Sequence, residues 1–162
     1  MNLPVAGESI PELAKVVTRE DVRAYAEASG DRNPLHLNDG VARSAGFPGV
    51  IAHGMFTMAH LASCVVRWAG GPEHVSRLKA QFRAPVFLGE EIVAGGTVRS
   101  VDPDARQVVL DVWVRVEREG ATEWPIRKGE AEVELTADGT RPNAPPGHPL
   151  PAVPPTDGGP EG

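Results

Sequence analysis

The chain has 162 residues, of which 41% are hydrophobic, and carries a formal net charge of −6. This length fits about one domain with a hydrophobic core, and an acidic chain without a block of Lys and Arg is poorly suited to bind nucleic acid or anionic lipid. The single cysteine, Cys64, excludes an internal disulfide and a zinc site built from cysteines, so the reducing cytoplasm is the expected compartment.

The first predicted element is a helix over residues 19–29. Thr18 and Asp21 have the spacing of a capping pair at its start, and Gly30 can end it. Apolar residues fall near one face of this helix, as expected for an element packed on a core. A short second helix is expected to follow and to end at Gly46.

A longer helix is predicted over residues 55–69, where apolar residues recur at three- and four-residue spacing until Gly70 and Gly71 stop them. Many of these residues are alanines, which indicates close packing against other elements. His60 and Arg67 interrupt the apolar run, so it falls short of the ~20 apolar residues of a membrane span.

After this helix the pattern becomes that of β-strands. Strands are expected at residues 75–82, 86–87, 91–100, 107–116 and 129–135. In the strand over 107–116, apolar residues alternate with residues such as Asp111, Trp113 and Arg115. This alternation is typical of a half-buried antiparallel strand.

Helices followed by strands indicate an α+β domain. We expect a single hotdog domain, in which an antiparallel sheet of about five strands wraps around one long central helix. Such a sheet has exposed edges, which proteins usually pair or cover. A dimer is therefore expected.

The composition changes after Leu135. Residues 136–162 hold eight of the 16 prolines and almost no large apolar side chains, so they bury too little surface to offset the entropy of ordering them. We expect one domain over residues 1–135 and a disordered Pro/Gly-rich tail over residues 136–162. The tail is expected to be an inert terminus rather than a docking peptide.

The loop after the first helix holds two groups that can transfer protons, Asp31 and His36, with Asn33 between them. Pro34 favours an extended conformation of Asn33, so the loop can direct these side chains into one cleft. The alternative is a plain turn in which Asp31 and Asn33 bond to backbone amides, and local composition alone favours it.

Gly54 stands at the start of the long helix, directly after His53. Its N–H belongs to the first turn, where amides lack partners within the helix and the helix dipole favours negative charge. An acyl oxygen bound there would be stabilised as it gains charge, and glycine has no Cβ to keep the ligand away. The alternative is an ordinary helix start with a glycine for close packing.

Together these groups meet the requirements of reversible hydration of an enoyl thioester. The reaction needs a polarised carbonyl, an activated water for C3 and a proton for C2. The N–H of Gly54 can supply the first. Asp31 and His36 can hold the water and divide the acid and base roles, and the sequence leaves open which residue takes which role.

Two motifs resemble the signature of the MaoC-like, (R)-specific enoyl-CoA hydratase (hydratase 2) family. One runs from Tyr25 to His36 and includes Asn-Pro-Leu-His; the other is Ile-Ala-His-Gly-Met at 51–55. A weaker similarity continues over residues 82–90, and the resemblance covers roughly residues 5–135. The similarity is strongest to the single-hotdog (3R)-hydroxyacyl-ACP dehydratase subunits of type II fatty acid synthesis, some of which pair with a catalytically silent subunit.

This resemblance implies a hotdog fold, a homodimer or a heterodimer, and a cofactor-independent lyase. The implied reaction interconverts (3R)-3-hydroxyacyl and trans-2-enoyl thioesters of CoA or acyl-carrier protein. It implies Asp31 and His36 as the catalytic pair, Gly54 as the oxyanion donor and Asn33 as a residue that orders the loop. Neither a cofactor nor a metal is expected.

Two other functions remain as alternatives. A non-catalytic acyl-thioester-binding subunit would keep the pocket without the chemistry, and Asp31 with His36 argues against it. A hotdog thioesterase would need a carboxylate or nucleophile on the central helix, yet residues 55–69 contain no Asp or Glu. His53 and His60 lack carboxylates at ligand spacing, so we expect packed or hydrogen-bonded histidines rather than a metal site.

Overall fold

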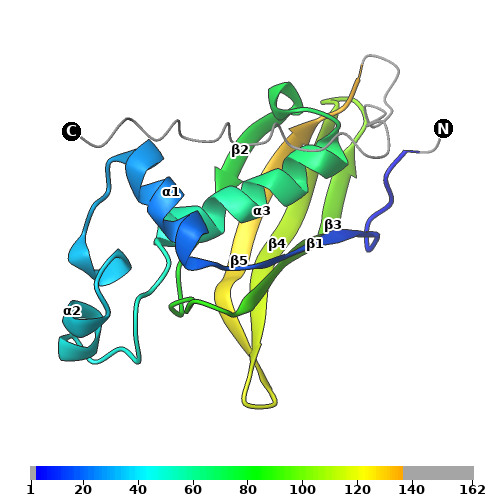
Figure 1. Ribbon diagram of the computed structural model, residues 1–162. Coiled ribbons are helices and arrows are strands. Elements are labelled where there is room, and N and C mark those ends of the chain that lie inside the picture. The colour runs from blue at the N-terminus through cyan, green and yellow to red at the C-terminus, as the bar shows by residue number, and fades with distance from the viewer. Residues whose placement is uncertain (1–2, 137–162) are drawn as a thin grey trace.

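The structure, a computed structural model, describes residues 3–136 (Figure 1). An antiparallel sheet of five strands curves around one long helix, α3 (Gly54–Ala69). This arrangement confirms the expected α+β hotdog domain. The predicted tail lies outside the described residues except for Thr136.

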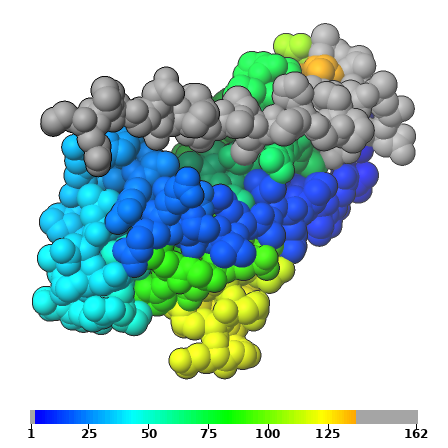
Figure 2. Space-filling view, in the orientation of Figure 1, coloured from blue at the N-terminus to red at the C-terminus, as the bar shows by residue number. Residues whose placement is uncertain are grey.

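The strands pair antiparallel in the order β1-β3-β4-β5-β2. They are β1 (Ser9–Val16), β2 (Val75–Lys79), β3 (Glu91–Asp102), β4 (Gln107–Arg118) and β5 (Ala121–Glu134). β4 and β5 are joined as a hairpin whose tip projects from the body of the molecule (Figures 1 and 2). The edges of the sheet are β1 and β2.

The expectation that all strands follow the helices is wrong, because β1 precedes them. β1 contains Pro11 and a register shift between Ile10 and Leu13, and Ile10 is its only fully buried residue. The strand therefore lacks the alternation that identifies a strand in sequence. Proline and a bulge are tolerated there because β1 lies at the edge of the sheet.

The expected strand at 86–87 is also wrong. Phe87 forms only an isolated bridge with Ile51, and residues 80–90 form a connection from β2 to β3. The N–H of Ala52 donates to the carbonyl of Val86 at 2.8 Å, which ties this connection to the segment before α3. β2 ends at Lys79 and is shorter than expected. β5 starts at Ala121 rather than at the expected 129, and its first half pairs irregularly with β4.

The predicted helices are confirmed. α1 (Arg19–Ser29) begins with a capping box in which Thr18 and Asp21 each bond to the other's backbone N–H. It ends at Gly30, whose φ of 75° is left-handed. The short second helix is α2 (Asp39–Ser44), and the chain leaves it through Gly46, whose φ is 94°.

The core lies between α3 and the concave face of the sheet. Leu61, Cys64 and Val65 of α3 are buried in one cluster with alternate residues of β4, such as Leu110 and Val112. Burial raises the pKa of the Cys64 thiol to about 11, so this cysteine is a packed hydrophobe and a poor nucleophile. No helix among the described residues is long and apolar enough to cross a membrane.

Candidate active site

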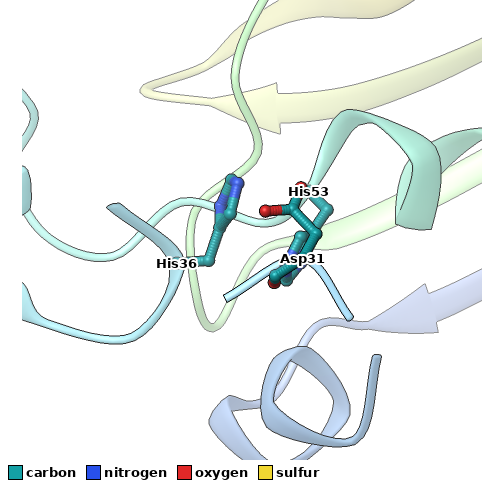
Figure 3. Close-up of side chains that lie close together, drawn as sticks. All are labelled: Asp31, His36 and His53. Carbon is teal, nitrogen blue, oxygen red and sulfur yellow. The ribbon is translucent and has the colours of Figure 1, made fainter. Parts of the chain in front are cut away.

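Asp31, His36 and His53 lie together beside the start of α3 (Figure 3). One oxygen or nitrogen atom from each of the three side chains lies within 4.8 Å of those of the other two. The sequence predicts the first two as a proton-transfer pair. It does not predict that His53 joins them.

The loop that carries Asp31 is ordered by its own side chains. The N–H of Asn33 donates to Oδ1 of Asp31 at 3.2 Å, and the N–H of Leu35 donates to Oδ1 of Asn33 at 3.1 Å. Asn33 thereby caps a single 3₁₀ turn, Pro34–His36. The turn hydrogen bonds of the plain-turn alternative are present, and the same turn presents His36. No hydrogen bond within the described chain reaches Oδ2 of Asp31.

His36 is half-buried, and its orientation is fixed by a backbone carbonyl. Nδ1 lies 2.8 Å from the carbonyl oxygen of Ile51. A carbonyl only accepts, so Nδ1 carries a proton, and Nε2 is the nitrogen that gains or loses one. The N–H of Ile51 donates in return to the carbonyl of Leu35 at 3.2 Å. His36 is therefore held with Nε2 available for chemistry.

His53 contacts both members of the predicted pair. Its ring stacks on that of His36, with centroids 3.8 Å apart and an interplanar angle of 29°. Its Nε2 lies 2.9 Å from the carbonyl oxygen of Asp31, to which it donates. The side chain is 2% exposed, and Nδ1 has no hydrogen-bond partner among the described residues.

The ring of Tyr25 lies 4.9 Å from that of His53 and supports it from α1. The prediction of a packed or hydrogen-bonded histidine at position 53 is confirmed. The place of His53 beside the pair is not predicted. The only sequence signal for that place is its position next to Gly54 in the second motif.

Asp31, His36 and His53 have the residue types of a two-histidine, one-carboxylate metal site. Metal ligation requires the lone pairs of both imidazoles to point at one ion within their ring planes. In the stacked rings these lone pairs lie in two planes that are inclined by only 29° with ring centroids 3.8 Å apart, so they do not converge at the ~2.1 Å of a metal–nitrogen bond. The stacking fits a role in positioning His36 better than a role in chelation.

Gly54 is the first residue of α3. The N–H groups of Phe56 and Thr57 bond to the carbonyl of His53, at 3.1 and 3.3 Å, whereas the N–H of Gly54 has no partner within the described chain. A Cβ at Gly54 would lie 3.5 Å from the ring of Phe82. The predicted oxyanion donor is therefore free, in a space bounded by an aromatic ring.

A cavity of about 330 Å³ opens in front of this amide, the size of a small-molecule site. His36, Gly54 and the buried hydroxyl residue Thr57 line it, together with the connection over 82–86. Ile51, Ala52 and Pro125 complete the wall. The structure thus brings His36 and Gly54 to one cavity and sets Asp31 against His36, while Asn33 stays in the loop.

The segment between α2 and His53 is anchored by Asp39. Its Oδ1 accepts the N–H of Val50 at 3.0 Å, and its Oδ2 accepts Nη2 of Arg19 at 2.8 Å. The bond from Val50, followed by Arg19, lowers the pKa of Asp39. These contacts fix the approach to Ile51, on which the orientation of His36 depends.

The chain is similar in sequence and fold to known hydratases and dehydratases. The MaoC like domain family matches residues 4–123. The (R)-specific enoyl-CoA hydratase of Rhodospirillum rubrum is 30% identical over 128 residues, which cover 78% of this chain and 85% of that protein.

A mitochondrial 3-hydroxyacyl-[acyl-carrier-protein] dehydratase of Arabidopsis thaliana is 38% identical over 87 residues, or 54% of this chain. The match spans about half (51%) of the Arabidopsis protein. Among solved structures, an (R)-hydratase from A. caviae involved in PHA biosynthesis superposes with a TM-score of 0.71 at 28% identity. This superposition covers 81% of the present chain and 96% of the hydratase.

Proposed function

The chain belongs to the MaoC-like domain family, and we propose that it is a hydro-lyase that interconverts (3R)-3-hydroxyacyl and trans-2-enoyl thioesters. The observation that carries this proposal is that His36 and the free N–H of Gly54 meet at one cavity, with the carboxylate of Asp31 grouped beside His36. The relatives are named as hydratases and dehydratases acting on such thioesters, which supports the same reaction.

In the hydration direction, the thioester oxygen accepts the N–H of Gly54. This donor stabilises the negative charge that the oxygen gains when water attacks C3, a contribution of about 3 kcal/mol in comparable sites. The helix dipole of α3 acts in the same sense. Gly54 is thus proposed as the oxyanion donor.

The water is proposed to lie between the carboxylate of Asp31 and Nε2 of His36. The reaction requires the pair to hold one exchangeable proton, either as carboxylate with imidazolium or as carboxylic acid with imidazole. The basic member takes a proton from water as its oxygen bonds to C3, and the acidic member delivers a proton to C2. The pair ends with the same number of protons, and dehydration reverses each step.

We also propose that the enzyme is a dimer, either of two identical chains or with a related hotdog subunit. Of the two edge strands, β1 is protected by Pro11 and its bulge. Within residues 3–136, β2 pairs only with β5, which leaves its other edge for a partner strand. Near the cavity, Met55 and Phe82 are 54% and 47% exposed. A partner subunit covering these side chains would also close the site.

The first experiment measures loss of enoyl-thioester absorbance with crotonyl-CoA and a longer trans-2-enoyl-CoA. Asp31→Asn and His36→Gln remove one proton-transfer group each with little change in shape, so each is expected to lower kcat at least 100-fold. Asp104→Asn and His74→Gln are the matched controls, because both residues lie away from the cavity.

Wild-type activity that collapses in both site variants and persists in both controls supports the proposal. A wild type that is silent on CoA and acyl-carrier thioesters, alone and with a related subunit, would favour the acyl-binding alternative. Full activity in either site variant would remove that residue from the proposed pair.

A further inference from the structure

A second hollow lies directly beside the catalytic cavity. It has a volume of about 620 Å³ and is lined by Arg83, Ala84, residues 122–124, Arg127 and Lys128. Arg83 and Ala84 line the catalytic cavity as well, so the two spaces adjoin across these residues. We call the second hollow the basic groove.

The basic groove carries unneutralised positive charge in a protein whose net charge is −6. Arg83, Arg127 and Lys128 form no ion pair within residues 3–136. The only carboxylate in its wall, Glu123, already pairs with Nη1 of Arg118 at 2.6 Å. Elsewhere on the sheet, arginines such as Arg99 are paired with carboxylates.

The groove is held in shape by backbone contacts between its two walls. The N–H of Arg83 donates to the carbonyl of Pro125 at 2.8 Å, and Phe82 bridges to Ile126 of β5. Trp124 packs edge-on against Trp113, with ring centroids 5.6 Å apart. Three cations therefore surround a preformed space rather than being scattered over a flexible surface.

From this geometry we propose that the basic groove binds the phosphate at the end of the pantetheine arm that carries the acyl thioester. This inference rests on the proposed function, which places the thioester carbonyl at Gly54. The arm must then leave the catalytic cavity, and the exit past Ala84 leads to the three cations. CoA and phosphopantetheinylated acyl-carrier protein share this phosphate, and guanidinium and ammonium groups bind phosphate strongly.

The test compares thioesters with and without the phosphate. The double variant Arg127→Ala/Lys128→Ala removes two cations that lie outside the catalytic cavity. Arg23→Ala/Arg67→Ala is the matched control, because it removes two exposed arginines that line neither space. Each protein is assayed with crotonyl-CoA, crotonyl-acyl-carrier protein and crotonyl-pantetheine, which has no phosphate.

For the groove variant we expect kcat/KM on crotonyl-CoA to fall about tenfold, mainly through KM, with kcat/KM on crotonyl-pantetheine unchanged. The control variant is expected to match wild type on both. A loss shared by CoA and the carrier protein supports the common phosphate, whereas a loss confined to CoA would overturn the proposal in favour of the nucleotide part of CoA. A loss confined to the carrier protein would overturn the proposal in favour of contact with that protein's surface.

Two further outcomes would also overturn it: an equal loss on crotonyl-pantetheine, or an equal loss in the control variant. Failure of the proposed function is distinguishable, because it abolishes turnover of every thioester in the wild type. In that case calorimetric titration with CoA itself tests whether the basic groove binds the phosphate. Binding that weakens about tenfold in the groove variant but not in the control supports the phosphate site, and unchanged binding refutes it.

Discussion

Two buried histidines, His53 just before α3 and His60 within it, make the same kind of hydrogen bond in two regions of the molecule. Nε2 of His53 donates to the carbonyl of Asp31, in the loop of the candidate site. Nε2 of His60 donates to the carbonyl of Leu13, on the edge strand β1, at 2.8 Å. His53 also stacks on His36, whereas His60 has no such ring contact among the described residues.

The two hydrogen bonds differ in the element that carries the accepting carbonyl: an edge strand for His60 and the loop of the candidate site for His53. His60 fastens a strand to the central helix, so its bond contributes to the stability of the fold. His53 fastens a loop whose side chains are proposed to do chemistry, so its bond contributes to the position of those side chains. The same kind of donor therefore has a positioning role just before α3 and a structural role within it.

Replacing His53 tests this difference in role most directly. His53→Ala removes both the bond to Asp31 and the ring beneath His36, and we expect kcat to fall about 100-fold, the scale of a misplaced catalytic group. His53→Gln keeps an amide donor for the carbonyl of Asp31 and loses only the stacking, so it should recover part of that loss.

His60→Gln is the matched control, because it keeps a donor for Leu13 on a histidine remote from the cavity. At a temperature where the proteins are folded, its kcat should equal that of wild type. Thermal unfolding separates positioning from collapse of the structure. If His53→Ala lost activity only in proportion to its unfolded fraction, His53 would be structural like His60.

The sequence predicts the parts of this site that are encoded locally. Asp31 and His36 are separated by a turn whose geometry follows from Asn33 and Pro34, and the start of α3 at Gly54 follows from the helical pattern. Each depends on residues close in the chain. The sheet and its central helix follow in the same way from alternation and spacing.

The parts that were missed depend on tertiary contacts. Nothing in the sequence places the ring of His53 on that of His36, because this contact requires the loop and the helix to meet. β1 is not predicted, because Pro11 and the mostly exposed side chains of the strand leave no alternation of apolar and polar residues. Its pairing partner β3 is also distant in sequence. The basic groove likewise joins Arg83 to Arg127 and Lys128 only through the sheet.

Gly54→Ala tests whether the glycine at the start of α3 serves stability or function. The added methyl group would sit 3.5 Å from the ring of Phe82, a normal contact, so the fold should accept it. Alanine favours the helix over glycine by up to about 1 kcal/mol, so the melting temperature should be unchanged or higher. We expect kcat/KM to fall about tenfold because the methyl group occupies space beside the amide that the thioester oxygen needs.

Met55→Ala is a useful companion for Gly54→Ala, because it trims an exposed side chain of the same turn without touching the amide. It should leave kcat largely intact. An activity loss in Gly54→Ala accompanied by a lower melting temperature would mean that the glycine is needed for packing, as the ordinary helix start requires.

The smallest expected effect is a pH dependence of stability at His60. Burial lowers the pKa of this imidazole below its ordinary 6.5, and the nearby positive charges of Lys15 and Arg67 add to the effect, while the bond to Leu13 opposes it. Between the folded pKa and 6.5 the unfolded chain binds more protons than the folded one, so stability rises with pH in this window. The fold should therefore lose stability as pH falls below 6.5.

Urea unfolding of wild type and His60→Gln between pH 5 and 8 measures this contribution as a difference, in which the titration of the remaining groups cancels. The two free energies of unfolding should run parallel above pH 7 and converge, or cross, as pH falls below 6.5. Parallel curves over the whole range would show that His60 titrates alike in both states. Its bond to β1 would then be accessible to water, and the contrast between His53 and His60 would rest on the stacking of His53 alone.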